Sequence, residues 1–141
     1  MEKDKSRFLK SDDGTVYDSK TSLTWMTNDS WLDLGKEVSW EEAEKYSNEM
    51  NKKKPGGYDD WRVPSVQEGL TLFDKDKLNK DFQGADIHLD SIFPPGAGNT
   101  TCTSDIRGRE AQIVFYGNGF PYWYEKNDKS ISHAVRLVRR D

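Results

Sequence analysis

The sequence predicts a small α+β domain, in which short antiparallel strands pack with two helices. Three observations support this: short alternating segments lie between Gly, Asn and Asp turns, two Ser-x-x-Glu boxes occur, and aromatic residues make up 12% of the chain, including five Trp. Alternation between turns favours antiparallel strands, and such boxes mark helix starts. Because large rings each bury about 150–250 Å², the 141 residues can form one core from them.

The N-terminal part of the chain predicts an antiparallel ribbon. Residues 1–6 are charged, which predicts a disordered end ahead of a single domain over residues 7–141. Residues 7–26 then hold three short alternating segments, separated by turn signals such as Asp12-Asp13-Gly14. This spacing is typical of hairpins.

Two helices are expected in the middle of the chain. Residues 27–37 are mostly polar and predict a loop. Ser39-Trp40-Glu41-Glu42 is a capping box, and the helix that follows should end at Pro55-Gly56-Gly57. Ser65-Val66-Gln67-Glu68 is a second capping box. Each box lets a serine hydroxyl and a glutamate side chain satisfy two free backbone amides.

The remaining segments are read as loops and strands. Residues 74–91 are polar and acidic, but they lack the glycine and glutamate spacing of a calcium loop. Residues 120–124 predict an aromatic loop or an edge strand. Strands are expected in three further segments: 100–104, 111–116 and 134–139.

Composition and charge exclude several classes of protein. The formal net charge of −4 argues against general nucleic-acid binding. Residues 100–141 nevertheless carry 7 Lys/Arg against 5 Asp/Glu, an excess of +2. No apolar run reaches the roughly 20 residues that span a bilayer. The start of the chain does not resemble a signal peptide, so we expect either a cytoplasmic protein or a segment of a longer, exported one.

The stretch from Gly57 to Glu68 is expected to be a structural corner. Trp61 should fill the core, and Arg62 should bond backbone carbonyls or pair with Glu68, because its guanidinium fork suits a carboxylate. Pro64 precedes the second helix. Trp25 and Trp40 are further candidate structural residues.

The chain's last third contains the candidate ligand-binding residues. Side chains alternate along a strand, so the consecutive rings of Tyr122, Trp123 and Tyr124 cannot all face the core. Aromatic faces with nearby polar groups suit concave binding sites, although such rings can also simply cover the open end of a core. Polar or charged residues that share these loops complete the set: Asp105, Arg107, Arg109, Asn118 and Asn127.

Catalysis and metal binding are not expected. Cys102 is the single cysteine, so no intrachain disulfide can form. A nucleophilic Cys102 would need a base, but His88 and His133 are far away in sequence, so a packed thiol is expected. One Cys and two His cannot assemble a paired-cysteine or histidine-cluster metal site within one chain. No cofactor is therefore predicted.

The most specific motif in the chain is Asp60-Trp61-Arg62-Val63-Pro64. With this motif the sequence resembles a known bacterial family, the domain named after the C-terminal domain of the Legionella collagen-like adhesin. Weaker marks are spread along the whole chain: Asp13-Gly14-Thr15-Val16, Asp18, Thr21, Leu23, Trp25, Trp40, Ala43, Tyr46, Gly57-Tyr58, Glu68, Leu72, Phe93-Pro94, Thr103-Ser104 and Val135-Arg136-Leu137-Val138-Arg139.

This resemblance implies a variant of the C-type lectin-like fold, related to formylglycine-generating enzymes. It implies paired first and last strands, two helices flanking a twisted antiparallel sheet, and long loops that carry the ligand surface. The sequence departs from the family at two positions. Gly69 stands where leucine is usual, and Cys102 stands where a tryptophan usually precedes Thr-Ser.

The expected function is non-catalytic recognition of a carbohydrate, through loops 104–109 and 117–130. The adhesin resemblance favours an anionic glycan. The alternatives are a protein-binding or structural module of a cell-envelope assembly, including a homo-oligomer, and a degenerate enzyme of the formylglycine-generating type. The compartment stays open: secreted or envelope-associated if the chain is part of an exported protein, otherwise cytoplasmic.

Overall fold

The computed structural model describes residues 6–128 and 132–140. Residues 1–5, 129–131 and 141 lie outside this description, and with them most of the predicted disordered N-terminus. The elements follow in chain order: β1 (Phe8–Lys10), β2 (Thr15–Asp18), β3 (Leu23–Met26), α1 (Ser30–Leu34), α2 (Trp40–Lys53), the short 3-10 helix η1 (Pro55–Gly57), α3 (Val66–Leu70), β4 (Asn79–Lys80), β5 (Asp86–Ile87), β6 (Thr100–Arg107), β7 (Glu110–Phe115), β8 (Phe120–Glu125) and β9 (Val138–Arg140).

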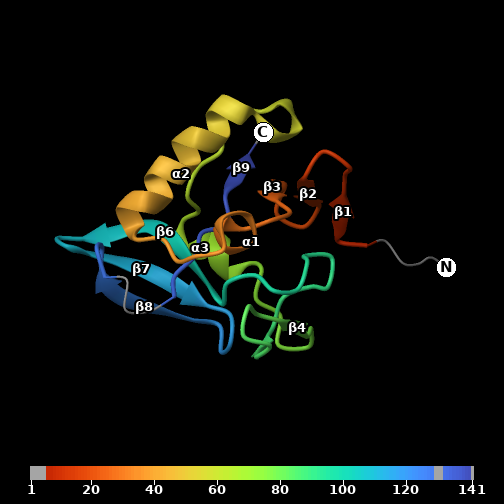
Figure 1. Cartoon of the computed structure of the whole chain (residues 1–141). Helices are drawn as coiled ribbons and strands as arrows, with labels where there is room; N and C mark the ends of the chain where they lie inside the picture. The colour runs from red at the N-terminus through yellow and green to blue at the C-terminus, as the bar shows by residue number, and fades with distance from the viewer. Residues whose placement is uncertain (1–5, 129–131, 141) are drawn as a thin grey trace.

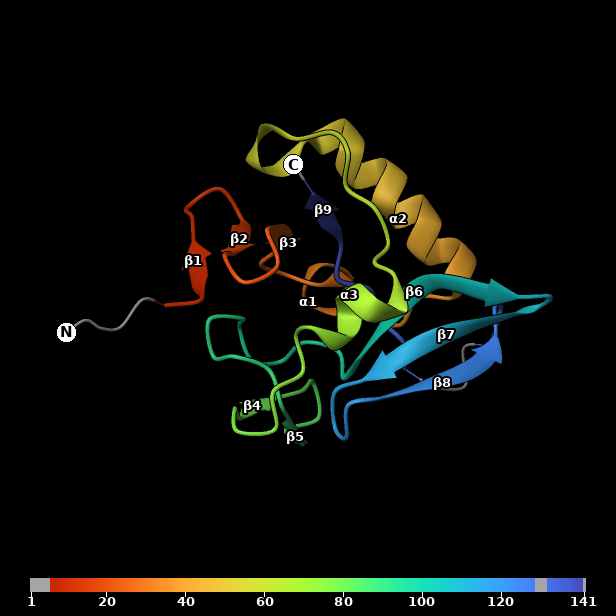
Figure 2. The same ribbon diagram turned by 180° about the vertical axis from the view of Figure 1, so that it is seen from behind.

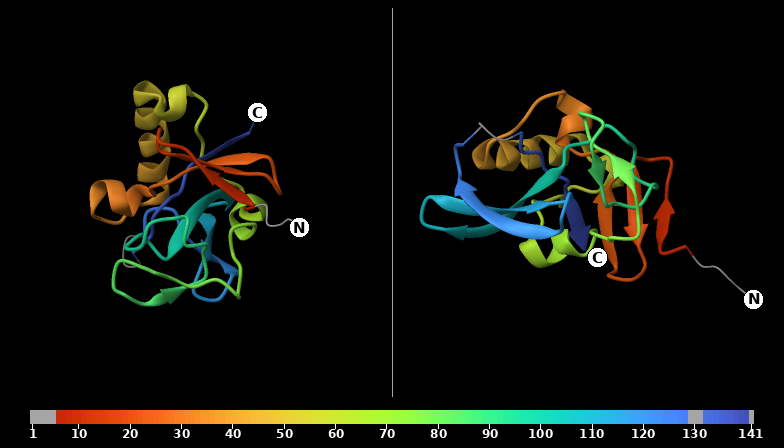
Figure 3. Two further views of the ribbon diagram at one scale, coloured as in Figure 1. Left: turned by 90° about the vertical axis from the view of Figure 1, so that its right-hand side faces the viewer. Right: turned by 90° about the horizontal axis from the view of Figure 1, so that it is seen from below.

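The strands form three antiparallel sheets, which confirms the predicted α+β class. Their orders are β1-β2-β3-β9, β4-β5 and β6-β7-β8. In Figure 1 the first and third sheets occupy opposite sides of the molecule, and α2 runs along its upper edge. The view from behind shows α3 at the centre, beside β6 and β7 (Figure 2). Figure 3 shows β1 at the end of the molecule opposite the projecting β6–β7 hairpin.

The hairpin ribbon predicted over residues 7–26 is present as β1, β2 and β3. The expected pairing of the first and last strands is wrong in detail. Strand β9 joins the same sheet, but it pairs with β3, with Trp25 opposite Val138, while β1 pairs with β2 at the other edge. Contacts made before β9 hold the returning segment on the β3 side of the sheet: Met26 N–H donates to the Leu137 carbonyl and Ser30 N–H donates to the Val135 carbonyl.

The segment leading into β9 joins the two larger sheets. A regular strand was expected over residues 134–139, but only Val138–Arg140 forms one. Residues before it bond to side chains as well as backbone: Ala134 N–H donates to Thr100 Oγ1 and Arg136 N–H to Thr101 Oγ1. On the other side, Met26 N–H donates to the Leu137 carbonyl. This segment is therefore buried along its length.

The two predicted capping boxes are both formed. The Ser39 hydroxyl accepts from the Glu42 N–H, and the Glu42 side chain accepts from the Ser39 N–H. Ser65 and Glu68 make the equivalent pair of bonds at α3. Helix α2 ends at Lys54, which adopts a left-handed conformation (φ 56°) before the Pro-Gly-Gly segment.

One helix was missed by the sequence analysis. Residues 27–37 were predicted to be a loop, but Ser30–Leu34 forms α1. Its cap is Asp29, whose side chain accepts from Leu32 N–H at 3.0 Å, and Gly35 ends it with φ 73°. An isolated helix of this length is not stable. Contacts made by buried Asp29 and Ser30 with distant segments hold it in place.

The core consists of two clusters of buried side chains. One surrounds Trp25 beneath the N-terminal sheet, and the other surrounds Trp61 between α2 and β6. Both indoles are at most 2% exposed. In the part of the chain that the structure describes, no helix is long and apolar enough to cross a bilayer.

Candidate functional site

The β6-β7-β8 sheet separates the candidate residues onto two faces. Residues directly opposite one another on antiparallel strands share a face. Tyr122 lies opposite Ile113 and Tyr124 lies opposite Ala111, whereas Trp123 lies opposite Gln112 on the other face. The pairing of β7 with β8 thus confirms that the three consecutive rings do not all face the same side of the sheet.

The tyrosine face contains a concave site of about 300 Å³, which we call the tyrosine hollow. Among residues 6–128 and 132–140, no charged side chain lines it. Its lining comes from the start of β6, from β7 and from β8: Asn99, Thr100, Ile113, Phe115, Tyr122 and Tyr124. Tyr122 is 37% exposed, so a ligand can reach its ring. A concave site with rings and a few polar groups is the usual form of a small-ligand site in proteins.

Local interactions position the exposed end of the tyrosine hollow. Asn118 Nδ2 donates to the Tyr122 hydroxyl at 2.7 Å, and Asn118 Oδ1 accepts from Phe120 N–H at 2.9 Å. Asn118 therefore fixes both the turn and the Tyr122 ring. A Cβ atom at Gly117 would lie 2.5 Å from Phe115 Cζ. Only glycine leaves room for the Phe115 ring beside this turn.

The hollow also carries hydrogen-bonding capacity that the described residues leave unused. Asn99 Nδ2 donates to buried Asp81 at 3.1 Å, which orients the amide. Among the described residues, nothing donates to Asn99 Oδ1 and nothing bonds to the Tyr124 hydroxyl. The Tyr122 hydroxyl accepts from Asn118 and keeps its own proton to donate. The hollow thus offers an acceptor and two hydroxyls beside three rings.

The opposite face carries a separate, charged arrangement. The Arg107 guanidinium lies over the Trp123 ring, 4.2 Å from its centroid, and Arg107 Nε donates to Glu110 at 2.9 Å. The Arg107 and Glu110 side chains are 61% and 39% exposed. The exposed ion pair therefore contributes little to stability. This group, Arg107, Glu110 and Trp123, is called the tryptophan face below.

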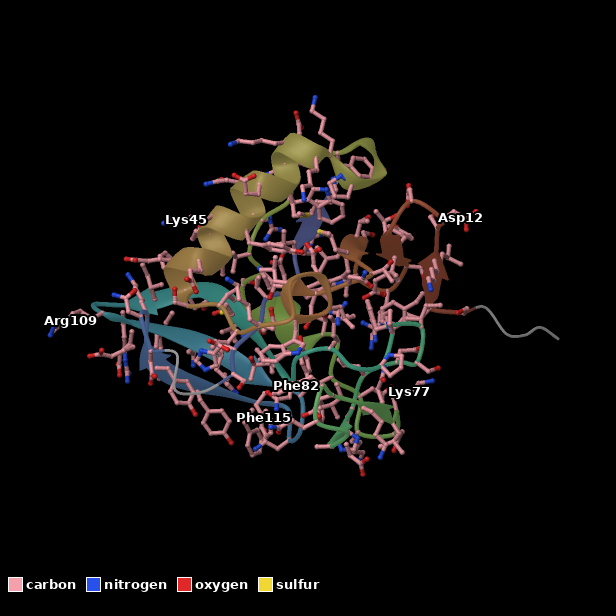
Figure 4. All side chains as sticks on the ribbon, viewed as in Figure 1. Asp12, Lys45, Lys77, Phe82, Arg109 and Phe115 are labelled. Atoms are coloured by element: carbon pink, nitrogen blue, oxygen red, sulfur yellow. The ribbon has the colours of Figure 1, made fainter. Side chains whose placement is uncertain are left out.

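Three predicted site residues join neither group. Asp105 is exposed, but its Oδ1 accepts from Val66 N–H at 3.2 Å, at the start of α3. Arg109 extends from the tip of the β6–β7 hairpin (Figure 4). Asn127 is exposed in the turn after β8. The structure therefore does not assemble the eight candidates into one site.

Cys102 and His133 do not form a catalytic pair on the surface. Cys102 is 2% exposed, and burial raises the pKa of its thiol to about 12. His133 is 3% exposed, its Nε2 has no partner among the described residues, and its ring packs 5.1 Å from that of Tyr124. The described residues contain no cluster of three His, Cys, Asp or Glu suited to a metal ion.

The expected structural corner is docked against the last strand. The backbone of Arg62 exchanges two hydrogen bonds with Val138, and the Pro64 carbonyl accepts from Ser104 N–H. Trp61 Nε1 donates to the Pro55 carbonyl at 3.1 Å. At the other end of α2, Trp40 Nε1 donates to the Thr103 carbonyl at 2.9 Å. These bonds hold the third sheet in a fixed position relative to α2 and α3.

One known family matches most of the chain. The Lcl C-terminal domain matches residues 14–139. The chain belongs to this family. The match runs from the β1–β2 turn to β9, so it includes the corner, both larger sheets and the tyrosine hollow. No curated protein and no solved structure matches the chain.

Some residues of the tyrosine hollow were not predicted. Phe115 was predicted only as part of the strand over residues 111–116, and no role was predicted for Asn99. The register of β7 against β8 places Phe115 with the tyrosines, and a long-range bond to Asp81 places Asn99. Alternation within residues 111–116 could have indicated the face of Phe115, but no local signal identifies the partner of Asn99.

Proposed function

We propose that this Lcl C-terminal domain recognises a carbohydrate without catalysing a reaction on it, and that the sugar occupies the tyrosine hollow. The observation that carries the proposal is the combination of three part-exposed rings with unused groups on Asn99, Tyr122 and Tyr124 in one concave site. Sugars present C–H surfaces that pack on rings and hydroxyls that exchange hydrogen bonds with amides and phenols. The site supplies both kinds of contact.

The charge of the hollow favours a neutral sugar over an anionic one. Among the described residues, its lining contains no Lys or Arg. Lys126 follows Tyr124 by two positions, but its ammonium lies over the Trp40 ring, 4.8 Å from the centroid. Arg107 and Arg109 belong to the β6–β7 hairpin. A sulfated or carboxylated glycan would find its counter-charges there, beside Trp123. The two surfaces therefore predict different ligands and a different response to salt, because exposed charge pairs are screened.

A glycan array probed at two salt concentrations tests the proposal. The wild-type domain should bind neutral glycans with little dependence on salt, and Tyr122→Ala should lose this signal. Trp123→Ala is the matched control, because it removes a neighbouring ring from the opposite face. If instead the only hits are anionic, salt-sensitive and lost in Trp123→Ala, the ligand binds to the tryptophan face and the hollow is not the site.

A protein partner is the second candidate function. The observation that favours it is the exposure of Phe120, at 61%, next to Tyr122 on the edge strand β8. Large exposed rings on an edge strand suit a protein interface. A domain that binds no glycan on the array but forms a concentration-dependent oligomer in light scattering, abolished by Phe120→Ser, would support this candidate instead.

The C-type lectin-like architecture and a location at the cell envelope are parts of the same proposal. Both follow from the family resemblance. The arrangement of β1 and β9 in one sheet, the helices α2 and α3 and the long connections support the first. The buried thiol of Cys102 supports a non-catalytic role over a degenerate formylglycine-generating enzyme, and metal analysis of the purified protein tests that point.

A further inference from the structure

A second pair of rings lies beside the tyrosine hollow. Trp31 of α1 and Phe82 of the β4–β5 turn stack with centroids 4.0 Å apart and an angle of 31° between their planes. Both residues are half-buried. They come from segments some 50 positions apart in sequence, and neither was a predicted site residue. Figure 4 shows Phe82 and Phe115 on the lower side of the molecule, where the β4–β5 turn and the end of β7 lie.

Gly98 and Asn99 link this ring pair to the hollow. A Cβ atom at Gly98 would lie 3.7 Å from Trp31 Cβ, so the start of the Trp31 side chain lies beside the residue before Asn99. The Asn99 amide bonds to Asp81, the residue before Phe82. Asn99 also lines the hollow. The two sets of rings therefore flank one asparagine.

Buried carboxylates hold the ring pair in place. Asp29 accepts from Leu32 N–H at the start of α1 and from Gly98 N–H at 2.9 Å. It thereby ties the helix that carries Trp31 to the segment beside the hollow. Asp81 Oδ1 accepts from the N–H groups of Gln83 and Ala85, both at 2.9 Å, which fixes the turn that carries Phe82. Preorganised rings of this kind lose little entropy when a ligand binds.

The pair also has an unused polar group. Among the residues that the structure describes, nothing accepts a hydrogen bond from Trp31 Nε1, and the neighbouring Gln83 is exposed. On the other side of Asn99, the Tyr122 and Tyr124 hydroxyls are available. Rings and hydrogen-bonding groups thus occur in both the hollow and the Trp31–Phe82 pair, and a sugar chain presents C–H faces and hydroxyls that can contact both kinds of group.

We propose that Trp31 and Phe82 form a second sugar subsite, so that the domain binds a chain of neutral sugars that passes over Asn99 rather than a single terminal sugar. The inference rests on the proposed function of the tyrosine hollow and deepens it. A sugar in the hollow contacts Tyr122 and Tyr124. Sugars further along the same chain contact the Trp31–Phe82 pair.

Titration with neutral oligosaccharides of increasing length tests this inference. The probes are gluco-, xylo- and chito-oligosaccharides of one to six sugars, with affinity measured by calorimetry. In the series that binds, affinity should rise beyond the disaccharide. Phe82→Ala should weaken binding of the hexasaccharide about three- to tenfold, the effect of losing one ring contact, and leave binding of the shortest binding member unchanged. Trp31→Phe, which keeps a ring stacked on Phe82, should give a smaller loss of the same kind.

Leu78→Ala is the control, since Leu78 is 58% exposed and lies outside both ring sets. The possible failures are distinct. If Tyr122→Ala abolishes binding but affinity does not rise with length, or Phe82→Ala binds the hexasaccharide like wild type, the second subsite is wrong and the hollow stands. If no series binds, both proposals are overturned.

Discussion

Arg62 and Glu68 form a doubly bonded ion pair, with Nη1 2.7 Å from Oε1 and Nη2 2.8 Å from Oε2. Glu68 Oε1 also accepts from Ser65 N–H, so the same carboxylate caps α3. The hydrogen bonds from Arg62 lower the pKa of Glu68 below its usual value. Because the Arg62 backbone pairs with Val138, this one contact joins the corner, α3 and the last strand.

Arg62→Lys should lower the free energy of unfolding by about 1 kcal/mol, because an ammonium cannot make two parallel bonds to a carboxylate. The expected loss of unfolding free energy is small because the Arg62 side chain is 44% exposed, so solvent screens its interaction with Glu68. Urea unfolding at neutral pH measures it. Lys52→Gln is the control: its pair with Glu49 is 74% and 61% exposed, so a change of less than about 0.5 kcal/mol is expected. If Arg62→Lys unfolds at the same urea concentration as wild type, the Arg62–Glu68 pair does not stabilise the fold.

Gly69 explains one departure from the family pattern. A Cβ atom there would lie 3.2 Å from Val114 Cγ2 and 3.3 Å from Thr101 Cγ2, and the Tyr116 hydroxyl donates to the Gly69 carbonyl at 2.8 Å. The β-branched side chains of Thr101 on β6 and Val114 on β7 thus occupy the space that a leucine side chain would need. The absence of a side chain at Gly69 lets α3 pack closely on these strands.

Gly69→Leu should therefore destabilise this chain by about 1–3 kcal/mol, the usual cost of overpacking a core. Thermal unfolding would measure the change. Gln67→Leu is the control, at an exposed position of the same helix. Because leucine and glutamine have similar helix propensities, this variant should change stability by less than about 0.5 kcal/mol. A Gly69→Leu variant more stable than wild type would show that β6 and β7 can yield to the side chain.

Local signals predicted the local structure well. The capping boxes at Ser39 and Ser65 and the ribbon over residues 7–26 depend on residues close in sequence, so the sequence contains the information directly. Helix α1 was missed because Asp29 caps it while also bonding to Gly98, 69 positions away. The candidate site was predicted only in part for the same reason.

The site shows this limit residue by residue. Alternation along β8 correctly separates Trp123 from its two tyrosine neighbours, and that follows from strand geometry alone. Adding Asn99 to the hollow requires the Asp81 turn, and assigning Asp105 to the start of α3 requires knowing that β6 passes Val66. Such contacts depend on tertiary packing, for which one sequence gives no local sign.

His133 should make stability sensitive to mild acid. Burial lowers the pKa of His133, only partly opposed by the charge of Asp128. In the unfolded chain the imidazole takes up a proton as the pH falls through about 6.5, whereas in the folded protein it stays neutral until a lower pH. Stability is therefore complete above about pH 6.5 and decreases as the pH falls toward the folded-state pKa, with a slope approaching 1.4 kcal/mol per pH unit.

Melting temperatures measured between pH 7.5 and 5.0 test this dependence. His133→Gln, which cannot take up a proton, should flatten the profile in that interval. The carboxylates of Glu68 and Asp60, whose pKa values are lowered by Arg62 and Arg139 respectively, lose their contribution only near pH 4 and below, so they do not obscure the effect. If His133→Gln loses as much stability as wild type between pH 7.5 and 5.0, another titratable group causes the pH dependence.

Cys102 should be unreactive in the folded protein. The thiolate is the reactive form, and burial both blocks access to the thiol and raises its pKa to about 12. An aromatic disulfide reagent at pH 8 should therefore label the native domain at least about a hundredfold more slowly than the urea-unfolded chain, because labelling must wait for an opening of the core. Cys102→Ser gives the background rate. Labelling of the native protein as fast as the unfolded chain would mean that the thiol is accessible, and it would restore Cys102 as a candidate nucleophile against the recognition role proposed above.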